Sequence, residues 1–268
     1  MRRGRLGLLA LVLCIVAGIS PVNAATASGV LDAGGQSQWI SCAGAGRPTI
    51  VIVSGLGADH RMWSKVLGPT RGVSRVCISD RPGLGLSPAR RGSLWTDAGE
   101  HAEELDALLT AAGEKGPYIL VGHSYGGLVV RAFAAQHRDE VAGVMLVEAV
   151  YPGIHRTFLP SYAGPWHEGG TLINMDASER ATAGGPNLGS TPLVVITAGR
   201  PGNGSSWADA QWNAEQAKSA RLSTQSVHWF ARQSGHVVQR DQPAIVITGV
   251  RWLVDRARQR EHRLRHQP

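Results

Sequence analysis

A serine between two glycines stands where an apolar segment gives way to one with helical periodicity. The pentapeptide Gly122-His123-Ser124-Tyr125-Gly126 follows the apolar run 118–121 and precedes residues 127–134, whose apolar positions share one helix face. This order predicts a buried strand, a sharp turn and a helix. The turn residue adopts a strained backbone conformation that only small neighbours two positions away permit. Ser124 should therefore present its hydroxyl at the carboxyl end of a strand, beside a helix N-terminus that favours negative charge.

Apolar runs and amphipathic segments alternate along the chain. Strands are predicted at residues 38–41, 49–53, 73–79, 118–121, 141–148, 192–197 and 225–230, and helices at 62–67, 101–112, 127–137, 207–221 and 243–258. Residues 25–35 are small and polar and predict a loose lead-in. The alternation predicts an α/β fold: a mostly parallel sheet of about seven to eight strands, with helices on both faces and ligands at the carboxyl ends of the strands. Residues 149–191 interrupt it with glycines and prolines and predict a short, loop-rich insertion.

The first residues have the pattern of an export signal. Three arginines precede the apolar run 6–19, and Val22-Asn23-Ala24 forms a small-residue cleavage site. We predict a signal peptide at residues 1–24, cleaved after Ala24, and one domain at 25–268 that is secreted or held in the cell envelope. An uncleaved membrane anchor is the alternative, but the run is short for a bilayer and no stable membrane insertion is expected.

The formal charge of +7 is concentrated at the two ends of the 268-residue chain. Residues 256–268 contain five arginines and one glutamate, and the leader contains arginines but no acids. The body between them is close to neutral, which argues against a nucleic-acid-binding face. The basic tail at 256–268 predicts a solvated helix end, with weak attraction to an anionic envelope as the alternative.

Two cysteines, Cys42 and Cys77, remain after the predicted cleavage. In an exported protein they are candidates for a disulfide, and the absence of a C-x-x-C motif argues against zinc or redox use. Closing the loop between them would stabilise the fold by about 4 kcal/mol on a chain-entropy argument. Two separately buried thiols are the alternative.

Four segments together resemble the α/β-hydrolase fold superfamily, over essentially all of residues 36–260. They are Ser54-Gly55-Leu56-Gly57, the Asp-Arg-Pro-Gly-Leu-Gly-Leu-Ser sequence of residues 80–87, Gly122–Gly127 and Ser234-Gly235-His236. The resemblance implies a serine hydrolase whose residues 149–191 form the cap over the active site. It also implies that the strand of Cys42 neighbours the strand of Cys77, which favours the disulfide.

A serine hydroxyl needs a base to remove its proton, and that base needs an orienting acid. In this superfamily the order along the chain is Ser, acid, His. His236 is the predicted base, because it follows the last strand, whereas His228 lies within that strand. Glu148 is the preferred acid, since it ends its strand on the catalytic edge. Asp209 remains the alternative, although Ser206-Trp207-Ala208-Asp209 predicts a capping box that would occupy it.

The resemblance assigns the oxyanion hole to the backbone N–H groups of Tyr125 and Leu56. We expect an acyl-enzyme mechanism on a small-molecule carboxylic ester or acyl substrate, with no cofactor and no metal. Thioester, lactone, amide or carbon–carbon bond hydrolysis is the alternative within enzymes, and a non-catalytic binding module is the alternative outside them. The aromatic residues that could line an acyl pocket are Trp63, Trp95, Phe158, Tyr162 and Trp166. The pattern leaves the oligomeric state undetermined.

Overall fold

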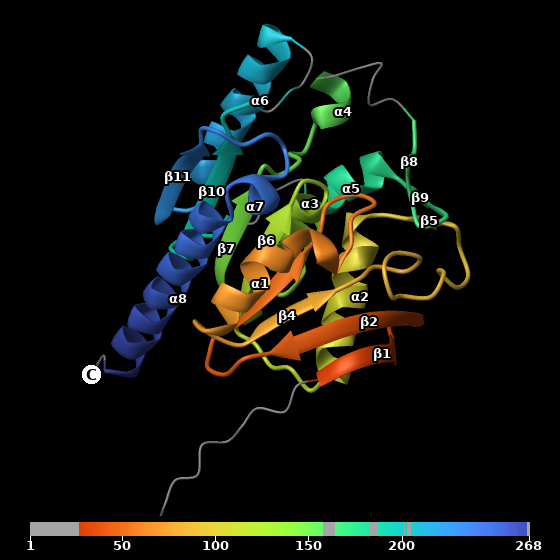
Figure 1. The fold of residues 1–268 in the computed structure, drawn as a ribbon, viewed down its shortest axis with the longest axis horizontal. Coiled ribbons are helices and arrows are strands. Elements are labelled where there is room, and N and C mark those ends of the chain that lie inside the picture. Colours follow the sequence, from red (N-terminus) through yellow and green to blue (C-terminus); the bar gives the residue numbers. More distant parts are fainter. Residues whose placement is uncertain (1–26, 158–163, 183–186, 201, 203–204, 267–268) are drawn as a thin grey trace, which may run out of the picture.

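An eight-stranded sheet forms the centre of the molecule (Figure 1). The computed structural model describes residues 27–157, 164–182, 187–200, 202 and 205–266, so the predicted signal peptide and its cleavage site lie outside the described residues. The strands in sheet order are β1 Ala27–Ala33, β2 Gln36–Ala43, β4 Val76–Ser79, β3 Thr49–Val53, β6 Tyr118–His123, β7 Val141–Val147, β10 Leu193–Ala198 and β11 Ser226–Ala231. From β4 to β11 all pairs are parallel, whereas β1 pairs with β2 and β2 with β4 in antiparallel fashion. The predicted mostly parallel sheet is confirmed.

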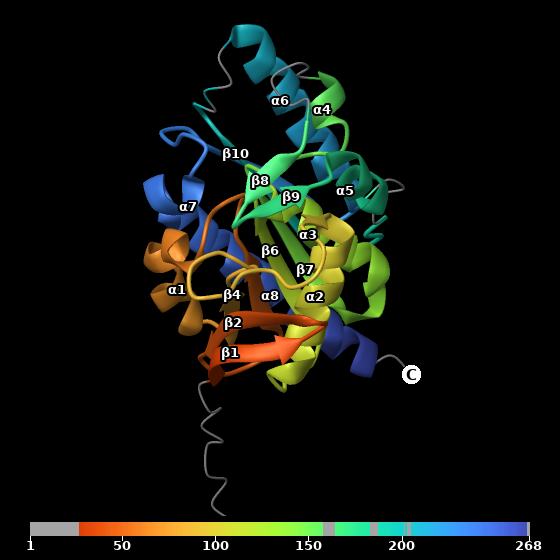
Figure 2. The ribbon, with the colours of Figure 1, turned by 90° about the vertical axis from the view of Figure 1, so that its right-hand side faces the viewer.

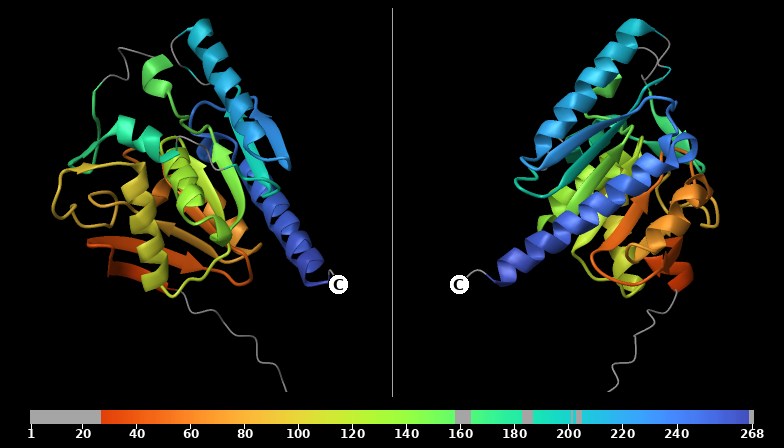
Figure 3. Two further views of the ribbon diagram at one scale, coloured as in Figure 1. Left: turned by 180° about the vertical axis from the view of Figure 1, so that it is seen from behind. Right: turned by 60° about the vertical axis from the view of Figure 1, so that its left-hand side comes forward.

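Helices cover both faces of this sheet (Figures 2 and 3). On one face lie α1 Ser64–Arg71, α7 Val238–Asp241 and α8 Pro243–Arg265, and on the other α2 Ala98–Ala111, α3 Gly126–Gln136 and α6 Ser206–Ser219. Short 3-10 turns occur at η1 His60–Trp63, η2 Arg138–Glu140 and η3 Ala220–Leu222. Alternate residues of β3 belong to the two cores, Ile50 and Ile52 to one and Val51 and Val53 to the other. Burial on both faces explains why the inner strands are continuous apolar runs.

The predicted loose lead-in at residues 25–35 is wrong, because most of it is strand β1. This strand pairs with β2 along its length, from Ala27 opposite Cys42 to Ala33 opposite Gln36. Gly34 and Gly35 form the two-residue turn, with φ angles of 58° and 77° that suit a tight hairpin. As an edge strand, β1 leaves much of its surface exposed and therefore lacks the apolar run that marks the inner strands.

The segment between β7 and β10, residues 149–191, carries small elements of its own. They are α4 Ile154–Thr157, β8 Trp166–Glu168, β9 Thr171–Ile173 and α5 Met175–Thr182. A two-residue strand from elsewhere in the chain, β5 Trp95–Thr96, joins them in a three-stranded sheet of order β5-β9-β8 (Figure 1). The α5 helix is fastened to α2, where the Ala98 N–H donates to Ser178 Oγ at 3.0 Å. We call residues 149–191 the inserted segment.

Cys42 and Cys77 form the predicted disulfide. The two residues lie directly opposite each other on the neighbouring strands β2 and β4, and both side chains are fully buried. The expectation that these strands are neighbours is also confirmed. Among the described helices, none has both the length and the apolar composition needed to cross a bilayer.

The basic tail is the mostly exposed end of a helix, as predicted for residues 256–268. Helix α8 continues to Arg265, Ala257 is buried, and Arg258 contacts the body of the protein. The Nε of Arg258 donates to the carbonyl of Arg47 at 2.9 Å and its Nη2 donates to that of Val73 at 3.2 Å. Ala257 and Arg258 thus attach the start of this exposed segment to the body of the protein.

Candidate active site

Ser124 occupies the sharp junction between β6 and α3. Its φ angle is 51°, and among the described non-glycine residues only Glu148 also has a positive φ. Strand β6 ends at His123 and helix α3 begins at Gly126, so the chain reverses within two residues. The Ser124 side chain is partly exposed, whereas its neighbours are buried. A strained conformation of this kind persists only where the surrounding structure enforces it, and such positions cluster at functional sites.

The two flanking glycines are required by close backbone contacts. A Cβ on Gly122 would lie 2.5 Å from the carbonyl oxygen of Gly126, and one on Gly126 would lie 2.4 Å from the carbonyl oxygen of Val53. Neither distance is possible for a real side chain. The junction therefore folds as it does because only glycine fits at both positions.

The glycine-rich loop after β3 lies against this junction. A Cβ on Gly55 would be 3.1 Å from the Cβ of Ser124, so loop and serine are in direct contact. Among the residues that the structure describes, neither the Leu56 N–H nor the Tyr125 N–H donates a hydrogen bond within the protein. The two residues assigned to the oxyanion hole thus lie next to Ser124, one in the adjoining loop and one directly after it in the chain.

His236 lies in the loop between β11 and α7 and is tied to the residue before Ser124. The Nε2–H of His123 donates to the His236 carbonyl at 2.9 Å, and the two imidazole rings lie 4.9 Å apart. Because a carbonyl only accepts, this bond fixes the His123 tautomer. Burial lowers the pKa of His123 to about 3, so it stays neutral. Burial also lowers the pKa of His236 below its usual value, which favours the neutral form that a base requires.

Glu148 directly follows β7 and is fully buried. Its backbone φ is 45°, and its Oε2 accepts from the Ala198 N–H at 2.6 Å. Burial raises the pKa of Glu148 to about 8; the Ala198 N–H opposes this shift and the charge of Asp209 adds to it. The residues on either side of Glu148 bond the backbone of Ser124, since Ser124 N–H donates to the Val147 carbonyl and Val150 N–H donates to the Ser124 carbonyl. Among the described residues, no hydrogen bond joins Glu148 to His236.

Comparison with known proteins agrees with this architecture. A family model described as the alpha/beta hydrolase fold matches residues 48–169. The uncharacterized protein YqjL of Bacillus subtilis (strain 168) is 27% identical over 205 residues, which cover 74% of this chain and 80% of that protein. Esterase PIR7B of Oryza sativa subsp. japonica is 32% identical over 103 residues, or 38% of each chain. The crystal structure of a membrane phospholipase A, a bacterial virulence factor, matches with a TM-score of 0.64 and 17% identity over 87% of both chains.

The chain has the α/β-hydrolase fold, and its residues 48–169 match the family of that description. In its sheet order β2 lies beside β4, which is the adjacency that the resemblance led us to expect. The family match and the partial similarity to an esterase support a hydrolase, and the bond that it would cleave is a matter for proposal.

The capping role that the sequence predicted for Asp209, the alternative acid, is not confirmed. Helix α6 is capped by Ser205, whose Oγ accepts from the Ala208 N–H at 3.1 Å. The predicted capping box starting at Ser206 is therefore wrong by one residue, and Asp209 does not occupy its third position. Asp209 lies close enough to Glu148 for its charge to raise the pKa of that carboxyl. Both acids thus stay candidates for the triad.

Asp80 holds its own loop together. Its carboxylate accepts from the Leu86 N–H at 3.0 Å and from the His60 N–H at 2.8 Å, and it pairs with the His60 ring at 2.7 Å. The next residue, Arg81, makes a buried ion pair with Glu168 of β8, which sequence reasoning missed. The sequence signal for it was limited to an arginine in the motif at residues 80–87.

The aromatic residues proposed for an acyl pocket differ in their placement. Trp63 is fully buried in the core and its Nε1–H donates to Ser54 Oγ at 3.1 Å, whereas Trp95 is largely exposed. Trp166 lies near the junction of β6 and α3, with its ring centroid 6.5 Å from that of Tyr125. Phe158 and Tyr162 lie outside the described residues. A tryptophan that was not proposed, Trp212, lies beside His236, with 6.2 Å between the ring centroids.

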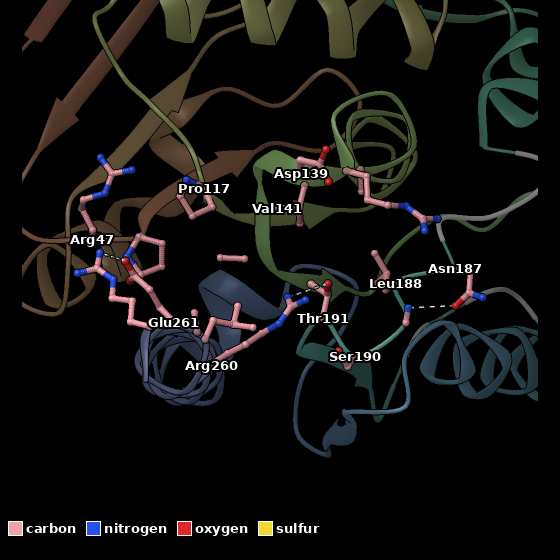
Figure 4. A pocket seen from close by; sticks show the side chains of 18 residues that line it. Arg47, Pro117, Asp139, Val141, Asn187, Leu188, Ser190, Thr191, Arg260 and Glu261 are labelled. Carbon is pink, nitrogen blue, oxygen red and sulfur yellow. Dashed lines mark hydrogen bonds and ion pairs between the residues drawn. The ribbon is translucent and has the colours of Figure 1, made fainter. Parts of the chain in front are cut away.

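A pocket of about 710 Å³ lies at the end of the sheet where the parallel strands begin, opposite the end that holds Ser124 (Figure 4). Its lining includes Pro117, which precedes β6, Val141, which starts β7, and Arg260 near the end of α8. These residues mark the amino ends of the strands, whereas Ser124 and Glu148 follow the carboxyl ends. The pocket is therefore separate from the candidate active site.

Two groups of side chains in the described part of the chain have metal-ligand types. One consists of Cys42, Cys77 and Glu114, but its cysteines are joined in the disulfide. The other consists of Asp106, His137 and Glu140 near the C-terminal end of α3, at the far end of that helix from Ser124. Neither group takes part in the candidate active site.

Proposed function

We propose that this α/β hydrolase is a secreted serine esterase. His236 removes the proton of Ser124, whose oxygen attacks the carbonyl carbon of a carboxylic ester. The N–H groups of Leu56 and Tyr125 stabilise the oxyanion of the tetrahedral intermediate. His236 protonates the departing alcohol, and water activated by the same imidazole then releases the acid from Ser124. Glu148 is the proposed orienting acid, with Asp209 as the alternative.

The observation that carries the proposal is the conformation of Ser124 together with the two N–H groups beside it. A φ of 51° costs a serine conformational free energy. Ser124 is partly exposed between buried neighbours, so packing of its own side chain does not account for that cost. Hydrogen-bond donors without a protein acceptor next to such a serine suit a substrate oxygen. The name of esterase PIR7B, a relative over 38% of the chain, supports an ester as the substrate.

Labelling with a fluorophosphonate probe tests this proposal, because the probe reacts with an activated serine. We expect the wild-type protein to be labelled and Ser124→Ala to remain unlabelled. His236→Gln should lose labelling as well, whereas His228→Gln, in the neighbouring strand β11, should keep it. Turnover of p-nitrophenyl esters of increasing chain length then identifies the preferred acyl group. Folded wild-type protein that neither reacts with the probe nor hydrolyses any ester would favour a binding module.

The proposed export is compatible with the disulfide, which forms in oxidising compartments. Expression of the full chain in an exporting host should yield a mature protein that begins at Ala25, as read by intact mass or N-terminal sequencing. Retention of residues 1–24 in the exported protein would instead favour the anchor.

A further inference from the structure

A buried ion pair joins the inserted segment to the loop after β4. Arg81 and Glu168 are exposed by only 7% and 5%. Arg81 Nε donates to Glu168 Oε1 at 2.6 Å, and Arg81 Nη2 donates to Glu168 Oε2 at 2.6 Å, so the contact is bidentate. Removing two charges from water is costly, and a buried pair persists where further hydrogen bonds satisfy the remaining donors and acceptors.

Those further hydrogen bonds all reach the glycine-rich loop on either side of Leu56. Arg81 Nη1 donates to the Ser54 carbonyl at 2.8 Å and Nη2 donates to the Gly55 carbonyl at 2.6 Å. Glu168 Oε2 accepts from the Gly57 N–H at 2.9 Å. The ion pair thus holds the backbone before and after Leu56. The Leu56 N–H itself has no acceptor within the described protein.

The same pair supports the second N–H donor. The Arg81 guanidinium lies over the Tyr125 ring, 5.4 Å from its centroid. The Tyr125 hydroxyl is bound to His101 Nδ1 at 3.0 Å, and burial lowers the pKa of His101 to about 3, so that ring is neutral. Trp166, on the same face of β8 as Glu168, packs against Tyr125 from the inserted segment. Side chains converging on Tyr125 therefore fix the start of α3.

The backbones of the two loops meet directly beside the ion pair. A Cβ on Gly83 would lie 2.1 Å from the carbonyl oxygen of Gly169, and a Cβ on Gly169 would lie 2.8 Å from the Pro82 carbonyl oxygen. Both glycines have positive φ, at 79° and 54°. Residues 81–83 and 168–169 are thus docked closely enough to set the position of the Glu168 carboxylate.

We propose that Arg81 and Glu168 are positioning residues that orient the Leu56 and Tyr125 N–H groups toward the oxyanion of the tetrahedral intermediate. The inference rests on the proposed function. Under it, the inserted segment supplies part of the oxyanion hole through Glu168. Neither side chain touches the reacting atoms; both act through the backbone of residues 54–57 and the ring of Tyr125.

The test compares Glu168→Gln with Glu114→Gln. The second variant neutralises the Arg75–Glu114 pair, which is largely buried, has a 2.6 Å contact and lies just before β4, at the opposite end of the strands from Ser124. For Glu168→Gln we expect kcat to fall about 10- to 100-fold, less than the loss of a whole oxyanion donor, with KM within about threefold of wild type. The affinity for an alkyl boronic acid, which forms a tetrahedral adduct on serine, should weaken in parallel. Glu114→Gln should change neither quantity, although both variants lower the melting temperature.

Arg81→Lys is the second variant, because it keeps the charge opposite Glu168 but loses the fork that binds the Ser54 and Gly55 carbonyls. It should show the same selective loss of kcat and of boronic acid affinity. If the wild-type enzyme hydrolyses esters and both variants match it in kcat and boronic acid affinity, the positioning role is wrong while the esterase proposal stands. If both variants fail to fold, the role is also wrong, since the pair would then serve the fold as a whole. A wild-type protein that is inert to the fluorophosphonate probe would contradict the proposed function itself.

Discussion

Glu148 is the residue whose environment is hardest to explain by folding alone. It combines complete burial of a carboxyl group with a φ of 45°. Each of these features costs free energy. Its pKa of about 8 means that the buried group is largely protonated at neutral pH. An acid that orients a histidine acts as a carboxylate, so the proposed role makes catalysis depend on this ionisation.

The pH profile of kcat/KM should therefore rise in two steps. The first step follows deprotonation of His236, whose pKa burial lowers below the usual value of 6.5, and the second follows ionisation of Glu148 near pH 8. Glu148→Gln should remove the upper step and lower kcat by about 10²- to 10⁴-fold, as loss of an orienting acid does. Asp209→Asn is the matched control. If Asp209→Asn lowers kcat by this amount and Glu148→Gln lowers it only slightly, Asp209 is the orienting acid.

The same carboxyl should make stability fall as pH rises. Its folded pKa, about 8, lies above the usual 4.5, so the unfolded state releases the proton first and the free energy of unfolding declines between these two values. Each pKa unit corresponds to about 1.4 kcal/mol. Glu148→Gln should thus gain a few kcal/mol over wild type at pH 8 and almost nothing at pH 4.5. Melting curves of both proteins across this range measure the gap, and a gap independent of pH would contradict the shift.

The sequence predicted the positions of Ser124, His236 and Glu148 because each follows a recognisable strand, and the order of strands decides which ends meet. It did not predict the contact between Arg81 and Glu168, which lie 87 residues apart. That contact depends on how the inserted segment folds back over the loop after β4. Strand periodicity carries no information about the path of such a loop-rich segment.

At the scale of the element, the junction of β6 and α3 has a clear steric requirement. Gly122→Ala should destabilise the protein by several kcal/mol or prevent folding, because its Cβ would lie 2.5 Å from the Gly126 carbonyl oxygen. Gly68→Ala provides the control: a Cβ at that position of α1 would have no atom within 4 Å, so the change should stabilise by roughly 0.5–1 kcal/mol. Urea unfolding of the two variants gives the comparison. Similar stabilities would show that the junction relaxes.

Elements with strong apolar runs were predicted well, and elements without them were not. The buried strands β3 and β6 match their predictions to within a few residues, since burial on both faces demands continuous apolar sequence. Strand β1 escaped prediction because an edge position needs no such run. The cap of α6 was misplaced by one residue, because Ser205 and Ser206 are equally good caps and only tertiary structure chooses between them.

The disulfide fastens β2 to β4, the antiparallel part of the sheet. Both cysteines are fully buried, so a reductant should act only on the unfolded chain. In the presence of dithiothreitol the protein should unfold at a lower urea concentration. The free energy of unfolding should fall by about 4 kcal/mol, which is the chain-entropy value for the 35-residue loop. Turnover below the transition should be unchanged, because Cys77 lies near the amino end of β4, whereas Ser124 follows the carboxyl end of β6. Equal unfolding curves with and without reductant would contradict a stabilising role.

At the scale of the whole molecule, helix α8 runs from the carboxyl ends of the parallel strands to their amino ends. It contains 23 residues and so spans about 34 Å. It begins shortly after His236 and ends beside the pocket of Figure 4, where Arg260 and Glu261 line the wall. Catalysis is proposed at the carboxyl ends of the strands, whereas the basic end of the chain lies at their amino ends. Mutations at the amino ends of the strands should therefore change stability without changing turnover.

Shortening the chain from its C-terminus tests this separation. A stop after Arg260 keeps the two hydrogen bonds from Arg258 to the Arg47 and Val73 carbonyls, and should leave the stability within about 1 kcal/mol of wild type. A stop after Asp255 removes these bonds and the buried Ala257, and should cost roughly 1–3 kcal/mol. Arg258→Ala against Arg263→Ala repeats the comparison with single substitutions. All four proteins should retain wild-type kcat/KM below their melting temperatures, and a loss of turnover in Arg258→Ala without a loss of stability would show that the two ends of the strands are coupled.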